Sequence, residues 1–330
     1  MANATAVLDL SMSPGRSCPL HYRYPPSVFR HAAELHAETL YIIGGLYGNV
    51  QALKEILALA AAESVTPTLV FNGDFNWFNV DPASFQTINL EVLKHIALRG
   101  NVETELAASA DDAGCGCAYP DYVEDADVER SNQIMRQLRT AAKAFPELTS
   151  ALTSLPMVVI AQVGSARFGI VHGDAESLAG WRFAHDSLHE SVNVNWLHQV
   201  CRAANLDGFA CSHTCLPTFR RFHDEDKQHI VINNGAAGMP NFSRTQYGLL
   251  SRISVHPARD GLAQYGGKVG DVYVDAIPVH YDATTFEKTF LDNWPEGSPA
   301  HHSYFRRIVD GPAYAAPHAL GLIRAPSVCA

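Results

Sequence analysis

The sequence predicts an α/β fold in which two β-sheets pack together and helices flank them. Two observations predict this fold. Short apolar runs alternate with helical patterns in the first half of the chain, and closely spaced strand-like segments follow in the second half. The chain has 330 residues, of which 47% are hydrophobic. This is enough for one large domain or two modest ones with a substantial core.

After an N-terminal arm over residues 1–38, the first half repeats a strand, a turn and a helix. The helical pattern is clearest where Leu53, Ile56, Leu57 and Ala60 recur at helical spacing. Such repeats imply a largely parallel sheet with helices on both faces. We predict strands at residues 40–44, 68–72 and 96–99, and helices at residues 50–63 and 82–95.

The pattern changes at residues 111–127, an acidic and glycine-rich segment that we interpret as an inserted loop before a helix at residues 128–145. The strands that follow are short and hairpin-like, which indicates a second sheet packed against the first. They are predicted at residues 157–162, 167–172, 208–212, 218–222, 229–233, 247–255 and 271–279. We place the core at residues 39–256 and a C-terminal extension at residues 257–330. We expect the last part of the extension, from residue 294, to wrap over the surface.

The charge balance argues against several classes of partner. With 34 acidic and 24 basic residues, the net charge is -10, and such a surface repels nucleic acid. No apolar run reaches the roughly 18 residues of a membrane helix, and the first twenty residues carry no secretory signal pattern. Seven cysteines in a chain of this length do not suggest a disulfide framework. We expect a cytoplasmic protein with reduced thiols and no membrane partner, and the oligomeric state stays open.

Metal-capable side chains follow four of the predicted strands. Because loops at strand ends converge above an α/β sheet, we expect these side chains to share a site. Carboxylate, amide and imidazole groups together suit a divalent ion such as Mn, Fe or Zn. The four segments are Asn72-Gly73-Asp74, Gly100-Asn101, His172-Gly173-Asp174 and Ser212-His213.

Six short blocks in chain order resemble those of calcineurin-like metallophosphoesterases, and the last is similar to a block of the bacterial small-phosphodiesterase branch. The resemblance runs from about residue 40 to residue 255. It implies a two-sheet β-sandwich flanked by helices that hydrolyses phosphate esters with bound metal. The blocks are Gly45-Leu46-Tyr47-Gly48-Asn49, Gly73-Asp74, Gly100-Asn101-Val102-Glu103, His172-Gly173-Asp174, Ser212-His213-Thr214-Cys215-Leu216-Pro217 and Asn234-Gly235-Ala236-Ala237-Gly238-Met239-Pro240.

One of the two metal positions that this resemblance implies is intact. Asn101, His172 and His213 stand at its ligand positions. Asp74 stands where the family has the residue that bridges both metals. The resemblance therefore implies that these four residues form the metal site and the catalytic site. The expected cofactor is one divalent ion, Mn, Fe or Zn.

The ligands of the other metal position are replaced. Gly45, Tyr47 and Cys215 stand where the family has one Asp and two His. Glycine offers no ligand atom, and a tyrosine is a poor ligand unless its phenol is ionised. We expect the ring of Tyr47 to fill the vacated space, with its hydroxyl donating to Asp74 or to a bound phosphate. The alternative is that Tyr47 turns into the core and water occupies the gap.

These features predict a metal-dependent phosphoester hydrolase, either a phosphodiesterase or a phosphatase, that acts on a small phosphorylated substrate. One metal ion can lower the pKa of a bound water, but it cannot clamp both sides of the displacement, so we expect a slow enzyme. The alternative is an inactive binding or scaffolding module, like the phosphoesterase-like subunit of retromer. Apolar surface patches in place of an open polar cleft would favour that alternative.

Further residues are candidates for roles near the site. We expect residues 111–127 to form a mobile flap beside the cleft, because the segment is glycine-rich and follows Asn101 closely. Its cysteines are interpreted as loop thiols, with a second metal site as the alternative. The candidates are Tyr47, Asn49, Asn72, Asp174 and Cys215 for the substrate pocket, Asp174 and His95 for proton transfer, and Cys115 and Cys117 for the loop thiols.

Overall fold

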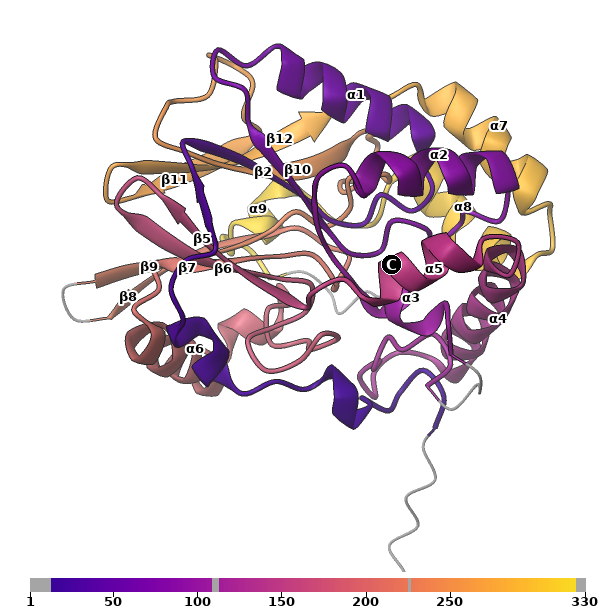
Figure 1. The fold of residues 1–330 in the computed structure, drawn as a ribbon, viewed down its shortest axis with the longest axis horizontal. Coiled ribbons are helices and arrows are strands. Elements are labelled where there is room, and N and C mark those ends of the chain that lie inside the picture. The colour runs from indigo at the N-terminus through magenta and orange to yellow at the C-terminus, as the bar shows by residue number, and fades with distance from the viewer. Residues whose placement is uncertain (1–12, 109–112, 225–226, 325–330) are drawn as a thin grey trace, which may run out of the picture.

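A computed structural model of the protein describes residues 13–108, 113–224 and 227–324, and Figure 1 shows its fold. The described strands form two mixed sheets of six strands each. In sheet order, the first comprises β1 (Leu35–Ala37), β5 (Val158–Val163), β6 (Ala166–Val171), β7 (Gly208–Cys211), β9 (Lys227–Asn233) and β8 (Thr218–Asp224). The second comprises β11 (Tyr265–Val269), β12 (Val272–Val279), β10 (Gly248–Ser254), β2 (Thr39–Ile43), β3 (Thr68–Asn72) and β4 (Ile96–Leu98).

Helices cover the outer faces of both sheets. In Figure 1, α1, α2 and α7 lie along the second sheet at the top, and α6 lies against the first sheet at the lower left. The α-helices are α1 (Val50–Ala61), α2 (Pro82–Val92), α3 (Asn101–Glu105), α4 (Asp125–Ala142), α5 (Pro146–Thr153), α6 (Ser191–Ala204), α7 (Ala283–Asn293), α8 (Pro299–Asp310) and α9 (Ala316–Ala319). Short 3-10 helices lie at Leu20–Tyr22, Pro26–Arg30 and Ser187–His189.

The alternation of side chains along β2 shows how the layers are built. Leu40 and Ile42 point into the apolar layer between the sheets, where they meet side chains such as Ile170. Tyr41 and Ile43 point the other way and pack with the helices over the second sheet. Because every residue of β2 is buried, the strand is central and apolar on both faces. This arrangement confirms the predicted two-sheet sandwich flanked by helices.

Parallel pairing gathers the ends of several strands at one edge. β2, β3 and β4 run parallel in the second sheet. β6, β7 and β9 run parallel in the first. The loops that follow β3, β4, β6 and β7 therefore leave the two sheets where their side chains can meet.

The later part of the chain is more regular than predicted. The region from residue 294, expected only to wrap over the surface, contains α8 and α9. Ser298 caps α8 by accepting from the His301 N–H at 3.4 Å, and Pro299 occupies the first turn. No helix was predicted at α3, α5, α6 or α7, and α4 begins at residue 125 rather than 128. Polar residues interrupt the apolar pattern of these helices, so the sequence does not show clearly where each helix begins.

Strands outside the predicted core boundaries complete both sheets. β1 lies before residue 39 and pairs with β5, while β11 and β12 lie beyond residue 256 and extend the second sheet. Among the described residues, no helix combines the length and apolar character needed to cross a bilayer. The six cysteines within the described ranges are all free.

Candidate metal centre

The four predicted ligands meet at one point above the strand ends. Asp74 follows β3 and Asn101 begins α3 just after β4. His172 follows β6 and His213 follows β7. The Nε2 atom of His172 lies 3.3 Å from Asp74 Oδ1, 3.2 Å from Asn101 Oδ1 and 3.2 Å from His213 Nδ1. A carboxylate, an amide oxygen and two imidazole nitrogens from distant parts of the chain are thus brought together, and all four side chains are buried.

Backbone carbonyls fix the orientation of these side chains. His172 Nδ1 donates to the carbonyl of the last residue of β3 at 2.9 Å, and His213 Nε2 donates to the Cys117 carbonyl at 3.0 Å. Asn101 Nδ2 donates to the Cys115 carbonyl at 2.9 Å, which turns its oxygen towards the shared point. Each imidazole therefore directs its second nitrogen at that point, as metal-binding histidines do.

This donor set fits a divalent metal ion. Neighbouring ligand atoms around a metal with bonds of about 2.0–2.2 Å lie roughly 3.0–3.5 Å apart, and the atoms around His172 Nε2 have this spacing. Without a shared cation, the lone pairs of His172 and His213 would face each other at 3.2 Å. A proton or a metal ion between them removes that repulsion.

Burial and charge act in opposite directions on these groups. Burial raises the pKa of Asp74, but the neighbouring His172 outweighs burial and brings the pKa below its usual value. Burial lowers the pKa of His172, but the charge and hydrogen bond of Asp74, together with smaller contributions from the Asn72 carbonyl and Glu103, raise this pKa by more, so the net shift is upward. Burial and the nearby His172 lower the pKa of His213 to about 3. Asp74 and His213 are thus in the forms that bind metal, whereas a metal ion at His172 would compete with the proton that Asp74 favours.

Glu103 stabilises the turn that carries Asp74, a role that was not predicted from the sequence. Its fully buried carboxylate accepts the N–H groups of Asp74, Phe75 and Gly100 at 2.8, 2.9 and 2.9 Å. Asp74 needs this support because its φ of 57° is left-handed, which is strained for a residue other than glycine. Burial and the charge of Asp74 raise the pKa of Glu103 to about 7. The Gly-x-x-Glu spacing at the start of α3 is the signal that could have revealed it.

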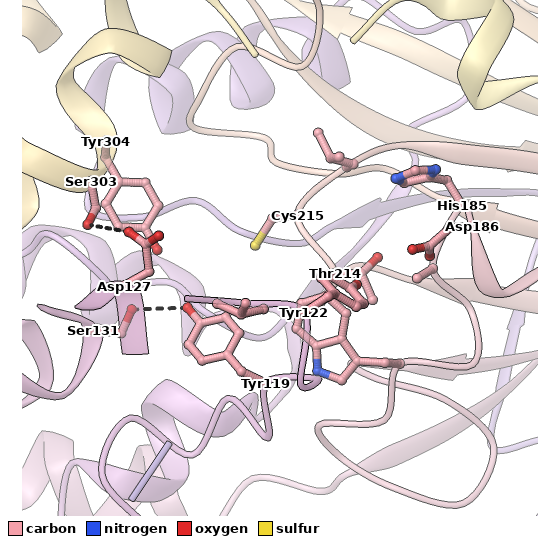
Figure 2. A pocket seen from close by; sticks show the side chains of 14 residues that line it. Tyr119, Tyr122, Asp127, Ser131, His185, Asp186, Thr214, Cys215, Ser303 and Tyr304 are labelled. Carbon is pink, nitrogen blue, oxygen red and sulfur yellow. Dashed lines mark hydrogen bonds between the residues drawn. The ribbon is translucent and has the colours of Figure 1, made fainter. Parts of the chain in front are cut away.

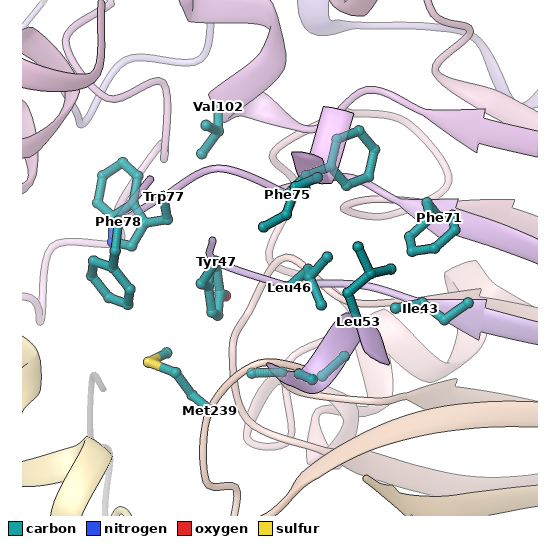
Figure 3. Packing of buried hydrophobic residues seen from close by; sticks show 14 of the residues in the cluster. Ile43, Leu46, Tyr47, Leu53, Phe71, Phe75, Trp77, Phe78, Val102 and Met239 are labelled. Carbon is teal, nitrogen blue, oxygen red and sulfur yellow. The ribbon is translucent and has the colours of Figure 1, made fainter. Parts of the chain in front are cut away.

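The ring of Tyr47 lies directly over Gly45. A Cβ atom added to Gly45 would lie 2.9–3.0 Å from atoms of that ring, so glycine is needed to leave room for it. The ring centroid is 5.8 Å from that of Phe78, and Figure 3 shows the ring between Trp77, Phe78 and Met239. Tyr47 is 3% exposed and itself has a left-handed φ of 54°. The space beside the metal centre on this side is therefore filled by an aromatic ring.

The hydroxyl of Tyr47 contacts Cys215, not Asp74 as we predicted. Tyr47 Oη lies 3.0 Å from Cys215 Sγ, and this sulfur lies 3.3 Å from the His213 carbonyl oxygen. The thiol can therefore donate to the carbonyl while it accepts from the tyrosine. Burial raises the pKa of Tyr47 and of Cys215, so both groups stay protonated at neutral pH.

Arg307 of α8 braces the loop that carries Cys215. Its Nη2 donates to the Cys215 carbonyl at 2.7 Å, and its Nε donates to the Pro240 carbonyl at 3.2 Å. The guanidinium group is buried. A helix near the C-terminus thus fixes backbone that lines the site.

An aromatic cleft leads to the metal centre. A cavity is lined by three of the predicted ligands, and a neighbouring, larger cavity adjoins it. Figure 2 shows the second cavity with aromatic side chains on either side of Cys215. The residues that line both cavities are Tyr119, Trp181, Cys215 and Tyr304.

The charge of this cleft is negative or neutral. Asp127, Asp186 and His185 line the larger cavity, and His213 lines the smaller one. Within the described ranges, neither cavity is lined by a lysine or an arginine. A ligand in the cleft would therefore meet little positive charge other than that of a bound metal ion.

The described part of the inserted segment is a packed wall of this cleft. Its residues 111–112 lie outside the described residues. The Cys117 carbonyl accepts from the side chains of His213 and of Trp181, each at 3.0 Å. Tyr119 lines the cleft, and Cys115 and Cys117 are buried. The position beside the cleft is as predicted, whereas these hydrogen bonds argue against a freely mobile flap at residues 115–119.

Four other candidates lie away from the ligands or serve the backbone. Asn49 caps α1 and donates to the Gly238 carbonyl at 2.9 Å. Asn72 links the two sheets, because its amide donates to the Val171 carbonyl at 2.7 Å. Asp174 accepts three backbone N–H groups of its own turn. His95 lies 3.3 Å from Glu91 at the end of α2. None of the four lines either cavity of the cleft.

Comparison with known proteins identifies the fold. No protein-family model and no curated protein matches the sequence. A metallophosphoesterase from Sphaerobacter thermophilus is similar in structure, with 16% identity, a TM-score of 0.53, and coverage of 83% of this chain and 100% of the other. A hypothetical protein from Pyrococcus horikoshii has 14% identity, a TM-score of 0.56, and coverage of 84% and 99%. The chain has the calcineurin-like metallophosphoesterase fold that its sequence blocks predicted.

Proposed function

We propose that the protein is a phosphoester hydrolase that uses one divalent metal ion held by Asp74, Asn101, His172 and His213. The observation that carries this proposal is that donor atoms of the other three residues lie 3.2–3.3 Å from His172 Nε2. The fold supports it, because the similar Sphaerobacter protein is a metallophosphoesterase. Mn, Fe and Zn all suit this mixture of oxygen and nitrogen ligands.

A bound metal ion would supply a Lewis acid for the phosphoryl oxygen and a water of lowered pKa. The chain supplies the positions of the surrounding groups. Asp74 stays ionised beside His172, and Glu103 fixes its turn. Tyr47 and Cys215 are neutral groups at the edge of the same cavity, and the Tyr47 hydroxyl can donate to a phosphate oxygen only if it leaves Cys215. Gly45 offers no ligand atom and the Tyr47 ring lies over it, so the chain offers a second ion little at this position, which favours slow turnover.

The cleft favours phosphodiesters over phosphomonoesters. A diester carries one negative charge and a monoester carries close to two at neutral pH. Since the described cleft residues include no lysine or arginine, extra charge on the substrate would find no partner there. The aromatic walls suit an aromatic or apolar group on the ester. We therefore propose a small phosphodiester with such a group as the substrate, in the cytoplasmic setting that the sequence predicts.

A turnover assay with added metals tests this function. Wild type should hydrolyse bis(p-nitrophenyl) phosphate faster than p-nitrophenyl phosphate after addition of Mn²⁺, Fe²⁺ or Zn²⁺ to protein stripped with a chelator. His172→Ala and His213→Ala should each remove turnover, because each loses a ligand. His223→Ala, which changes an exposed histidine of β8, is the matched control and should keep it.

One observation favours a binding module as the second candidate. Tyr47 and Cys215 close the position where a two-metal enzyme would hold its other ion. A protein that binds a phosphodiester in the presence of metal, but releases it unchanged at high protein concentration, would support that reading and exclude the hydrolase.

A further inference from the structure

A second cluster of metal-capable side chains lies on the outer side of the first sheet. His198 comes from α6, Asp224 ends β8 and His229 lies near the start of β9. One potential ligand atom from each residue lies within 4.8 Å of the other two. His198 Nδ1 is 3.8 Å from Asp224 Oδ2, and the rings of His198 and His229 have centroids 5.5 Å apart.

The strand alternation explains why these side chains meet. In β9, Ile230 and Ile232 point into the layer between the sheets. Val231 points outward and packs with the buried face of α6. His229 is two residues from Val231 and so lies on this outer side. His198 is on the buried face of α6, so the two histidines meet between the helix and the sheet.

The facing atoms of the cluster have no hydrogen-bond partners. His198 Nδ1, Asp224 Oδ2 and both ring nitrogens of His229 are buried without a partner. His229 is fully buried and His198 is 8% exposed. Buried polar groups are normally hydrogen-bonded, because an unpaired one loses its interaction with water and gains nothing. Several unpaired donors and acceptors that face one point indicate a missing ligand.

We propose that His198, Asp224 and His229 bind one Zn²⁺ ion. Two imidazole nitrogens and one carboxylate oxygen are a common zinc ligand set, with a fourth position left for water. Arg202 Nη1 lies 3.2 Å from the other carboxylate oxygen, Asp224 Oδ1. This contact orients Oδ2 towards the histidines, as outer partners of metal ligands do. The ion would fasten the β8–β9 hairpin to α6.

This site is distinct from the candidate metal centre. In the pairing of β7 with β9, Gly208 lies opposite Ile230 and Cys211 lies opposite Asn233. His213 follows the end of β7 beyond Cys211, whereas His229 lies next to Ile230, at the other end of these parallel strands. The zinc ion would therefore have a structural role and would not contact a substrate in the cleft.

Metal analysis of the full-length protein tests the proposal. The variant His198→Gln/His229→Gln should bind one Zn²⁺ fewer per chain than wild type by equilibrium dialysis. His223→Gln changes an exposed histidine of the same hairpin and should bind as many ions as wild type. Equal zinc content in wild type and the double variant would overturn the proposal, as would an equal loss in the His223→Gln control.

Further variants separate this site from the catalytic one and guard against misfolding. Zn²⁺ should raise the Tm of His172→Ala, which keeps the proposed zinc site, but not that of the triple variant His172→Ala/His198→Gln/His229→Gln, which lacks both sites. Asp224→Asn keeps the side-chain shape and should weaken zinc binding at least tenfold. If Asp224→Asn is folded and binds zinc at this site as tightly as wild type, the proposal is wrong. Loss of turnover in His172→Ala bears only on the proposed hydrolase function.

Discussion

The hydroxyl of Tyr47 and the thiol of Cys215 lie 3.0 Å apart, beside the candidate metal centre. The ring that carries this hydroxyl lies over Gly45. The resemblance implies that Gly45, Tyr47 and Cys215 replace metal ligands. In this structure the three residues pack together: Gly45 leaves space for the Tyr47 ring, and Cys215 contacts the Tyr47 hydroxyl. The effects of substitutions at these positions on the free energy of unfolding should therefore not be additive.

Gly45→Ala should destabilise the protein through two separable effects. The left-handed backbone of Gly45, with φ of 65°, costs an alanine about 1–2 kcal/mol. Overlap with the Tyr47 ring adds about 1–3 kcal/mol. In a Tyr47→Ala background only the backbone cost should remain. Denaturant unfolding of the four proteins of this cycle measures the coupling.

Gly261→Ala is the matched control for that cycle. Gly261 has a φ of 75°, and a Cβ added there meets nothing within 4 Å. It should show the backbone cost alone, with or without Tyr47. Strict additivity of Gly45→Ala and Tyr47→Ala would contradict the packing of Gly45 against Tyr47.

Glu103→Gln should destabilise the fold and weaken metal binding together. The carboxylate accepts three backbone N–H groups, and hydrogen bonds to a charged group contribute about 1.5–3 kcal/mol each. A glutamine has a single neutral acceptor oxygen, so the Asp74 turn loses support. We expect a loss of at least about 1.5 kcal/mol in unfolding free energy and a weaker metal dissociation constant. Glu147→Gln, at an exposed position, should change neither.

Tyr122→Ala should weaken binding of aryl substrates without removing turnover. Tyr122 lines the larger cavity and is 49% exposed. An aromatic contact contributes about 0.5–1.5 kcal/mol, so KM should rise roughly two- to tenfold while kcat stays close to that of wild type. Kinetics with bis(p-nitrophenyl) phosphate and methyl p-nitrophenyl phosphate check this. A fall in kcat with unchanged KM would place Tyr122 in the chemistry instead.

Asp275 should make stability depend on pH through a raised pKa. Burial raises its pKa to about 6, although the neighbouring Arg252 lowers it in part. The unfolded chain releases this proton near pH 4, so between about pH 4 and pH 6 the native state binds more protons than the unfolded state. Stability from this group is therefore lost as the pH rises through that window.

The variant Asp275→Asn removes this titration. Wild type should lose unfolding free energy relative to Asp275→Asn as the pH rises from about 4 to about 6. Above that window the difference should stay constant. If the difference in unfolding free energy between wild type and Asp275→Asn does not change from pH 4 to pH 8, the pKa of Asp275 is not raised in the native state.

The sequence was most informative about the metal ligands, because each follows a strand and strand ends converge in this fold. Asp74 and His172 could be predicted on that ground alone. The hydrogen bond between Tyr47 and Cys215 could not be predicted. The two residues lie 168 positions apart in the sequence, and only the packing of their loops determines which atom the hydroxyl contacts. The same holds for His198 and His229. Each looks like an isolated histidine until the helix and the strand are packed together.

The brace between Arg307 and Cys215 has a consequence for synthesis of the chain. A nascent chain that ends just after His213 already contains all four proposed ligands of the candidate metal centre. It still lacks β10, which pairs with β2, and it lacks Arg307, which lies 92 residues after Cys215. The loop that carries Cys215 gains the hydrogen bond from Arg307 only once α8 has been translated. We therefore expect the proposed metal ion to bind after most of the chain has been translated, because shorter chains carry the proposed ligands without this support.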